Sequence, residues 1–252
     1  MQPVFTRKEK KVILFDFNDT LLDKQQCFYN AFAEALSEFV ARLDGNEFDI
    51  SAAVERYAKE WIKKPTATRR KRSASAYFEH KQLECLRKSL LGSPFPITES
   101  FLRSLLKRVK ELMPAYPRLF PDVIETLEKL SGHYRLAIIS NGSREKLETT
   151  LSRSGLKPMF PDGQIFVPSN RNLKKPHPDI FRRALTALEV SGAEAVMVGN
   201  SWKNDIFGAN RCGIDTVWLQ HKNKKTVQRK IGKNKVIFVS RCKQLLGLFE
   251  LS

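Results

Sequence analysis

Asp16 is the first residue of the chain whose type and position could do chemistry. It follows a short, continuous apolar run at residues 12–15, which is typical of a strand buried on both faces. In an open α/β sheet, ligands bind beyond the carboxyl ends of the strands, so this carboxylate is placed as a catalytic nucleophile would be. Aspartates at such points also form turns and cap helices, so Asp16 alone does not decide between these roles.

Polar residues also occur at three later points of the chain. Ser140 and Asn141 follow a predicted strand, where a hydroxyl and the backbone N–H groups of a helix start could hold a phosphate oxygen. Lys175 precedes a proline-containing turn that opens a helix, and Asn200 and Asp205 follow another predicted strand. Taken singly, the first could be an ordinary capped turn, the second a solvated surface lysine and the third the end of a strand. Taken together with the first aspartate, they form a candidate site.

The elements that must position these residues alternate between strand and helix from about residue 117 onward. Such alternation predicts a parallel sheet with helices on both faces. Between residues 24 and 116 the apolar residues instead recur three or four apart, which predicts a helical insertion. We therefore expect a core formed by residues 1–23 and 117–252, and a separate helical domain at residues 24–116.

The stretch D-F-N-D-T-L at residues 16–21 resembles the first motif, D-x-D-x-T, of the haloacid dehalogenase-like hydrolases. Ser140, Lys175 in its K-P-x-P context and the segment from Gly199 to Asp205 are similar, in order and spacing, to the second, third and fourth motifs. Phrases such as ISNGS and KKPHPDIF look like the cap-bearing phosphatase branch. The resemblance implies an α/β fold, with a Rossmann-like doubly wound parallel sheet core and an inserted α-helical cap domain.

The resemblance also implies hydrolysis of phosphate esters. Asp16 would attack phosphorus and form an aspartyl-phosphate, which is covalent catalysis by a carboxylate. Lys175 would bind the phosphoryl group together with Ser140, and its positive charge would hold the aspartate ionised. Thr20 and Asn141, which lie in the first two motifs, are the other expected substrate contacts.

The metal expected from the resemblance is Mg²⁺. It would lie between Asp16, the backbone carbonyl of Asn18 and the fourth-motif side chains of Asn200 and Asp205. Asn18 stands where most phosphatases of the superfamily have an acid/base aspartate, and losing general acid–base help typically costs about 10²- to 10⁴-fold. Asn200 replaces the usual metal-binding aspartate, so we expect weaker metal affinity.

The composition contains no sign of a membrane span or of a metal–thiolate site. The chain has 252 residues, of which 42% are hydrophobic, and no stretch approaches the roughly 20 apolar residues of a span. No apolar segment of signal-peptide length precedes the first strand, so the expected location is cytoplasmic. The four cysteines and four histidines are scattered, without the spacing of a zinc site or a disulfide framework.

The formal charge of +17 favours anionic ligands. Much of the excess lies at residues 63–72 and 222–235, and neither segment has the interleaved aromatic residues that a base-stacking surface needs. We therefore expect both segments to be solvated basic loops. The expected partner is a small anionic, phosphorylated substrate, without nucleic acid or membrane, and the sequence leaves the oligomeric state open.

Three functions agree with these residues. The first is a Mg²⁺-dependent phosphatase for a small phosphorylated metabolite, slow or confined to good leaving groups. The second is a 2-haloacid dehalogenase-like enzyme, whose halide leaves without a proton, although that branch carries a tyrosine at the position of Asn18. The third is a catalytically weak binding or regulatory protein on the same fold, because sites rather than folds decide function.

Overall fold

The structure is a computed structural model that describes residues 4–42, 48–63, 74–221 and 227–251. The chain forms two compact units, one made of Met1–Lys24 with Pro117–Ser252 and the other of Gln25–Tyr116. Among the described residues, no helix is both long and apolar enough to cross a membrane. Each unit is built around its own group of buried side chains, and the predicted site residues belong to the first unit.

The first unit contains a seven-stranded sheet with the order β3-β2-β1-β4-β5-β7-β6. All neighbouring strands pair in parallel except β6 and β7, which are antiparallel. The strands are β1 (Val12–Phe15), β2 (Arg135–Ile139), β3 (Ile165–Phe166), β4 (Ala195–Gly199), β5 (Asp215–Leu219), β6 (Val227–Ile231) and β7 (Asn234–Val239). The predicted α/β architecture with a mostly parallel sheet is confirmed.

The position of β1 between β2 and β4 explains why distant motifs meet. Its four side chains are completely buried, as its apolar run predicts for a strand covered on both faces. Phe15 lies opposite Ile138 of β2 and Val198 of β4. Since parallel strands end at the same edge of a sheet, the residues that follow these three strands lie at one edge.

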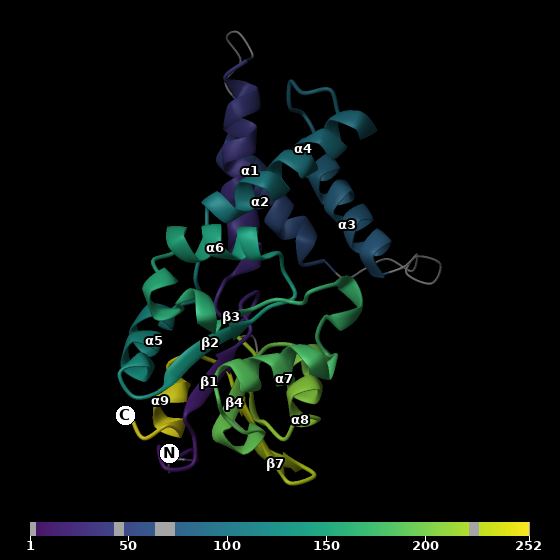
Figure 1. The fold of residues 1–252 in the computed structure, drawn as a ribbon. Coiled ribbons are helices and arrows are strands. Elements are labelled where there is room, and N and C mark those ends of the chain that lie inside the picture. Colours follow the sequence, from purple (N-terminus) through teal and green to yellow (C-terminus); the bar gives the residue numbers. More distant parts are fainter. Residues whose placement is uncertain (1–3, 43–47, 64–73, 222–226, 252) are drawn as a thin grey trace. The chain divides into compact units, whose positions relative to one another are not determined.

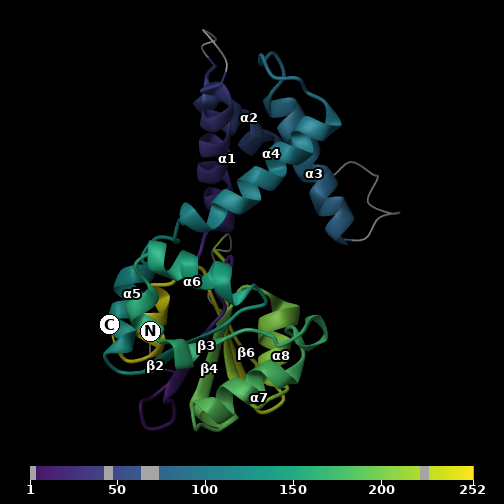
Figure 2. The same cartoon turned by 45° about the horizontal axis from the view of Figure 1, so that its top comes forward.

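Helices cover both faces of the sheet (Figures 1 and 2). On one side lie α5 (Val123–Ser131) and α9 (Gln244–Leu248), and on the other lie α7 (Pro178–Ala187) and α8 (Gly208–Asn210). The helix α6 (Arg144–Arg153) connects β2 to β3. Apolar side chains of α7 pack with those of β1, β2 and β4 in one buried cluster, which holds the sheet edge in place behind the site.

The basic segment at residues 222–235 is not simply a loop, and that part of the prediction is wrong. Its described residues include the whole of β6, which pairs with β7 from Val227 opposite Phe238 to Ile231 opposite Asn234. The cause is backbone pairing with the strong strand pattern of β7, which the charge of the segment did not reveal. The other basic segment, residues 63–72, lies outside the described residues from residue 64 onward.

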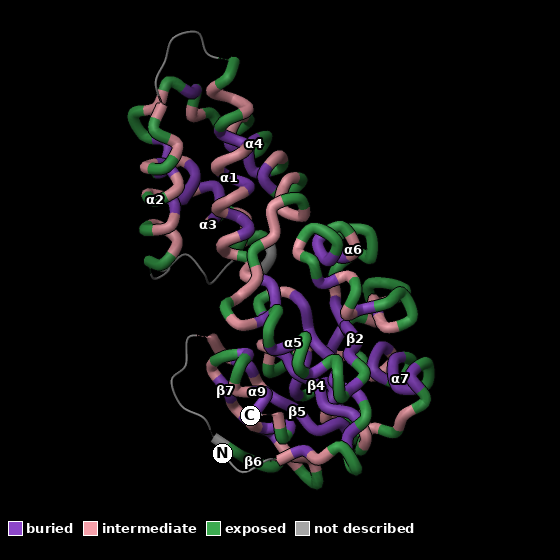
Figure 3. The backbone as a smooth tube through the Cα atoms, turned by 90° about the vertical axis from the view of Figure 1, so that its left-hand side faces the viewer, coloured by how far each residue is buried: buried purple, intermediate pink, exposed green. Residues whose placement is uncertain are grey.

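The second unit contains helices joined by turns, and no strand among its described residues. Its helices are α1 (Lys24–Val40), α2 (Ile50–Trp61), α3 (Ala74–Ser89) and α4 (Glu99–Leu112). Their apolar faces form one buried cluster, seen as the purple stretches along these helices in Figure 3. Phe28 of α1 stacks on Tyr57 of α2, with ring centroids 4.8 Å apart, so the helices are held by aromatic packing.

Candidate active site

Lys175 is the central residue of the candidate site. Its ammonium group lies 2.7 Å from Asp16 Oδ1, 2.7 Å from Asp205 Oδ1 and 2.7 Å from the backbone carbonyl oxygen of Ile139, and it donates to all three. The Lys175 residue is only 4% exposed. Side chains from the first, third and fourth motifs are therefore in direct contact, although Asp16 and Lys175 are 159 residues apart.

The charge state of Lys175 follows from competing effects. Burial alone lowers the pKa of an ammonium group, but the carboxylates of Asp16 and Asp205 outweigh it, and the pKa of Lys175 is raised. Burial also raises the pKa of Asp205, against the opposing effect of the lysine. The arrangement keeps a protonated lysine between two acidic side chains.

Thr20 connects Asp16 to the fourth motif. Its hydroxyl donates to Asp16 Oδ2 over 2.9 Å and lies 3.5 Å from Asn200 Oδ1. Both oxygens of the aspartate thus have a donor, one from the threonine and one from Lys175. Because a single hydroxyl contacts both, Asp16 Oδ2 and Asn200 Oδ1 converge on one point although they follow different strands.

Ser140 and Asn141 lie at the same edge, but they make different contacts. The Ser140 hydroxyl oxygen accepts a hydrogen bond of 3.2 Å from the backbone N–H of Gly142. The Asn141 side chain accepts from the backbone N–H of Lys175 over 2.7 Å and donates to its carbonyl over 3.1 Å. Asn141 therefore fixes the backbone of the segment that carries the lysine.

Asn18 is half-buried and lies near the Ser140 loop. A Cβ atom built on Gly142 would be 3.5 Å from Ser140 Oγ and 4.0 Å from Asn18 Nδ2, so both side chains border the same glycine. The amide of Asn18 thus occupies the place where the family pattern has a titratable carboxylate. An amide in this position can donate a hydrogen bond but cannot supply a proton as an acid.

The fourth motif enters the site through an unusual helix. After β4 the chain forms the π-helix η7 (Trp202–Phe207), which is followed by the short helix α8. Asp205 accepts a hydrogen bond of 2.9 Å from the backbone N–H of Ser201. A Cβ on Gly199 would approach the Asp205 side chain to 2.5 Å, so only glycine allows this close packing. The π-helical turn of η7 places the Asp205 side chain against Gly199, at the end of β4.

Three further residues at the carboxyl end of β5 contact the site, and the sequence patterns did not indicate them. Trp218 Nε1 and Gln220 Nε2 both donate to the backbone carbonyl of Asn200, over 2.8 and 2.9 Å. His221 Nε2 lies 3.0 Å from the backbone carbonyl of Thr20, and burial lowers the pKa of His221. These residues lie at the carboxyl end of β5. The rule that ligands bind beyond the carboxyl ends of parallel strands could therefore have located them.

Comparison with known proteins decides the family. The family model described as "Hydrolase: haloacid dehalogenase-like hydrolase" matches residues 10–213, which include every site residue predicted from the sequence. The chain is a haloacid dehalogenase-like hydrolase. The predicted family and its enzyme class are therefore confirmed.

Several relatives of this haloacid dehalogenase-like hydrolase are phosphatases. It is 29% identical over 212 residues to the glyceraldehyde 3-phosphate phosphatase of Pyrococcus abyssi, covering 84% of this chain and 82% of that protein. It is 29% identical over 219 residues to the phosphoglycolate phosphatase of Colwellia psychrerythraea, covering 85% and 86%. It is also 38% identical over 115 residues to the (S)-2-haloacid dehalogenase 4A of Burkholderia cepacia, covering 44% and 48%.

The fold of this haloacid dehalogenase-like hydrolase is also found among solved structures. The HAD-hydrolase YfnB from Bacillus subtilis, bound to magnesium, matches with a TM-score of 0.62 and 19% identity, covering 96% of this chain and 99% of that one. At this level of identity the match establishes the fold alone. It agrees with the predicted Rossmann-like core.

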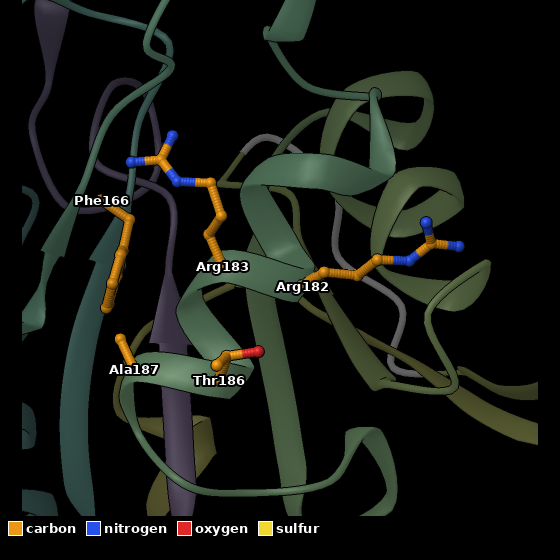
Figure 4. Close-up of a pocket in the computed structure, with 5 residues that line it drawn as sticks. All are labelled: Phe166, Arg182, Arg183, Thr186 and Ala187. Carbon is orange, nitrogen blue, oxygen red and sulfur yellow. The ribbon is translucent and has the colours of Figure 1, made fainter.

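A separate pocket of this hydrolase has a volume of about 400 Å³ and lies between β3 and α7 (Figure 4). Its lining residues are Phe166, Arg182, Arg183, Thr186 and Ala187, so no predicted site residue borders it. In Figure 4 the Arg183 side chain extends beside Phe166, whereas that of Arg182 points the other way. Because the two arginines diverge, they do not form one anion clamp.

Proposed function

We propose that this hydrolase is a Mg²⁺-dependent phosphatase that acts on a small phosphorylated metabolite through an aspartyl-phosphate on Asp16. The observation that carries the proposal is the contact of Asp16, Lys175 and Asp205 at the carboxyl edge of the sheet. The phosphatase relatives that match more than four fifths of the chain support the same chemistry. Glyceraldehyde 3-phosphate and phosphoglycolate, named for those relatives, are examples of the substrate class.

In the first step, a carboxylate oxygen of Asp16 attacks phosphorus while the bond from phosphorus to the leaving oxygen breaks. Lys175 holds this carboxylate in place by donating a hydrogen bond to it, and its charge balances the incoming phosphoryl group. The Ser140 hydroxyl and Thr20 bind phosphoryl oxygens, and Asn141 acts through the backbone of the lysine segment. Water then attacks the phosphorus of the aspartyl-phosphate and releases inorganic phosphate.

The site lacks a general acid at position 18 to protonate the leaving group. Asn18 cannot protonate the departing alkoxide, so that oxygen must leave as an anion or take a proton from water. We therefore propose that the enzyme is slow on alkyl phosphates and favours substrates with good leaving groups, such as acyl or aryl phosphates.

The oxygen donors present fit a magnesium ion. Asp16, the backbone carbonyl of Asn18 and the side chains of Asn200 and Asp205 would hold it, all through oxygen, as Mg²⁺ prefers. The convergence of Asp16 Oδ2 and Asn200 Oδ1 on the Thr20 hydroxyl supports such a shared ligand set. When bound, Mg²⁺ neutralises phosphate charge and orients the phosphoryl group for in-line attack. The missing charge at Asn200 predicts a lower affinity than an aspartate would give.

We propose that the helical unit is a cap domain that selects the substrate, as its place in the sequence directly after the first motif suggests. On this proposal, the core holds the reaction residues and the cap supplies selectivity. The cytoplasmic location expected from the sequence stays a prediction.

A dehalogenase is the second candidate function, favoured by two observations. One is the 38% identity to a 2-haloacid dehalogenase over 44% of the chain. The other is Asn18, because a halide leaves without a proton and does not need an acid at that position. A catalytically weak binding or regulatory protein on the same fold is the third.

One set of assays separates these functions. Purified protein is tested on p-nitrophenyl phosphate and acetyl phosphate, with Mg²⁺ and with a chelator, beside Asp16→Asn. Turnover that disappears with chelator and in Asp16→Asn supports the phosphatase. Asp162→Asn, which removes an exposed carboxylate elsewhere in the core, is the matched control and should retain activity. Chloroacetate turnover that continues in the presence of chelator would instead support a dehalogenase. Absence of both phosphatase and dehalogenase activity would support the binding protein.

A further inference from the structure

Three aromatic rings from three separate segments meet near the β6 edge of the sheet. Trp202 opens η7, Trp218 lies in β5, and Phe238 lies opposite Trp218 in β7. The ring centroids are 4.9 Å apart for Trp202 and Trp218, and 5.0 Å apart for Trp218 and Phe238. We call these three rings, together with Arg229 of β6, the aromatic–basic surface.

This surface is accessible to a partner. Trp202 is 40% exposed, and the Trp218 and Phe238 rings that pack against it are half-buried. Arg229 is exposed, with its guanidinium carbon 5.8 Å from the centroid of the Phe238 ring. The strand β6 that carries it is drawn as exposed in Figure 3. A single exposed aromatic side chain needs no explanation, but an exposed indole packed on two further rings and flanked by an arginine offers a stacking platform.

The exposed charges of the segments that carry the platform have one sign. Lys203, next to Trp202, and Lys233, in the turn between β6 and β7, are both exposed. Between residues 201 and 249 the acidic residues are Asp205 and Asp215. Both are buried, and each pairs with a buried lysine. Within residues 201–249, the described charged side chains that reach solvent are therefore all cationic.

We propose that the aromatic–basic surface binds single-stranded nucleic acid, with a base stacked on Trp202 and backbone phosphates held by Arg229 and the neighbouring lysines. Proteins that bind single strands combine a cationic track with aromatic side chains on which bases stack. An acidic peptide without aromatic side chains would use the cations but would have no group to stack on the exposed indole. The proposal differs from our expectation from sequence, because β5, β7 and η7 supply the aromatic residues that segment 222–235 lacks.

The test measures binding of the full chain by fluorescence anisotropy. The probes are a labelled oligothymidylate of about 12 nucleotides, within the usual site size of single-strand binders, and an abasic strand of equal length and charge. We expect the strand with bases to bind more tightly, and both affinities to fall as salt is raised. Trp202→Ala should weaken binding of the oligothymidylate at least about fivefold, since stacking is lost, and leave the abasic strand unaffected. Trp202→Phe should retain most of the affinity.

Arg229→Gln should weaken both strands, because it removes a phosphate contact. Its matched control is Arg153→Gln, which removes the same charge from an exposed position on α6, at the opposite edge of the sheet from β6. Asp16→Asn should bind as the wild type does, so the result is independent of the proposed phosphatase activity. Circular dichroism and thermal unfolding of each variant confirm that it is folded.

Three outcomes would overturn the proposal. The first is equal affinity of the wild type for the strands with and without bases. The second is unchanged binding in Trp202→Ala. The third is an acidic peptide of equal charge that binds as tightly as the oligothymidylate and displaces it, which would identify the surface as a docking site for acidic proteins.

Discussion

The indole nitrogen Nε1 of Trp218 donates a hydrogen bond of 2.8 Å to the backbone carbonyl oxygen of Asn200. Gln220 Nε2 donates to the same oxygen over 2.9 Å, so two side chains after or within β5 hold the loop of the fourth motif. Asn200 is a proposed metal ligand without a negative charge, and its amide must therefore be well placed to bind a cation. The two donors restrict the backbone that determines where this amide lies.

Trp218→Phe should lower the affinity of the site for Mg²⁺ while preserving the aromatic packing. It removes one donor to the Asn200 carbonyl, which we expect to raise the Mg²⁺ concentration for half-maximal activity by about two- to tenfold. Direct Mg²⁺ titration by calorimetry should show the same loss. The control is Trp202→Phe, which leaves both bonds to Asn200 intact. Equal Mg²⁺ affinity in Trp218→Phe and the wild type would show that these bonds do not position the ligand.

Lys175→Met should abolish phosphatase activity and destabilise the core. The substitution leaves the buried Asp16 and Asp205 without their cation, and breaking a buried ion pair in this way typically costs about 3–5 kcal/mol. Urea unfolding measures the loss. Adding Asp205→Asn to Lys175→Met should restore part of the stability, because one uncompensated carboxylate is removed. If the destabilisation of the double variant equals the sum of those of Lys175→Met and Asp205→Asn, an uncompensated carboxylate at position 205 is not the cause.

Asn18→Asp should raise the phosphatase rate at least about tenfold by restoring a general acid. The gain should be larger for an alkyl phosphate than for p-nitrophenyl phosphate, because only the poor leaving group needs a proton. Steady-state rates on the two substrates measure this difference. Asn172→Asp, which adds the same charge at an exposed position outside the site, should leave both rates unchanged. An equal gain on both substrates would point to an electrostatic effect rather than to acid catalysis.

His221 should make the stability of the core depend on pH. Its side chain stacks on Phe120 and contacts the Thr20 carbonyl, and burial holds its pKa below the usual 6.5. A depressed pKa means that the folded state favours the neutral ring. Its stabilising contribution is therefore complete above about pH 6.5 and is lost as the pH falls through 6.5 toward the lower folded value.

The measurement for His221 is the urea midpoint of the wild type and His221→Gln at about pH 7.5 and about pH 5.5, on either side of the usual histidine pKa. The difference between the two proteins should shrink at the lower pH. His133→Gln, at an exposed position, is the control and should show a constant difference. If the difference in urea midpoint between the wild type and His221→Gln is the same at both pH values, the fold does not hold the ring neutral.

Much of the architecture could be predicted from local patterns. The apolar run before Asp16 marks a buried strand, and strand–helix alternation after residue 117 indicates a parallel sheet. These patterns are reliable because strand and helix periods come from backbone geometry within a few residues. The order of the motifs then places their side chains at one edge, because parallel strands end together.

The contacts between distant segments could not be predicted in this way. No local pattern indicates that Asn141 binds the backbone of Lys175, or that Trp218 and Gln220 hold the Asn200 carbonyl. The β6–β7 pairing and the aromatic–basic surface also depend on which strands become neighbours.

The sequence by itself determined the family, the strand ends and the identities of the residues that could react. Only the tertiary structure decided which side chains touch the reacting groups and which rings reach the surface. The physical reason is that hydrophobic periodicity acts over a few residues and determines the elements. The register between strands, by contrast, determines contacts across the sheet to within a few ångströms, and each contact requires two segments that are far apart in the chain.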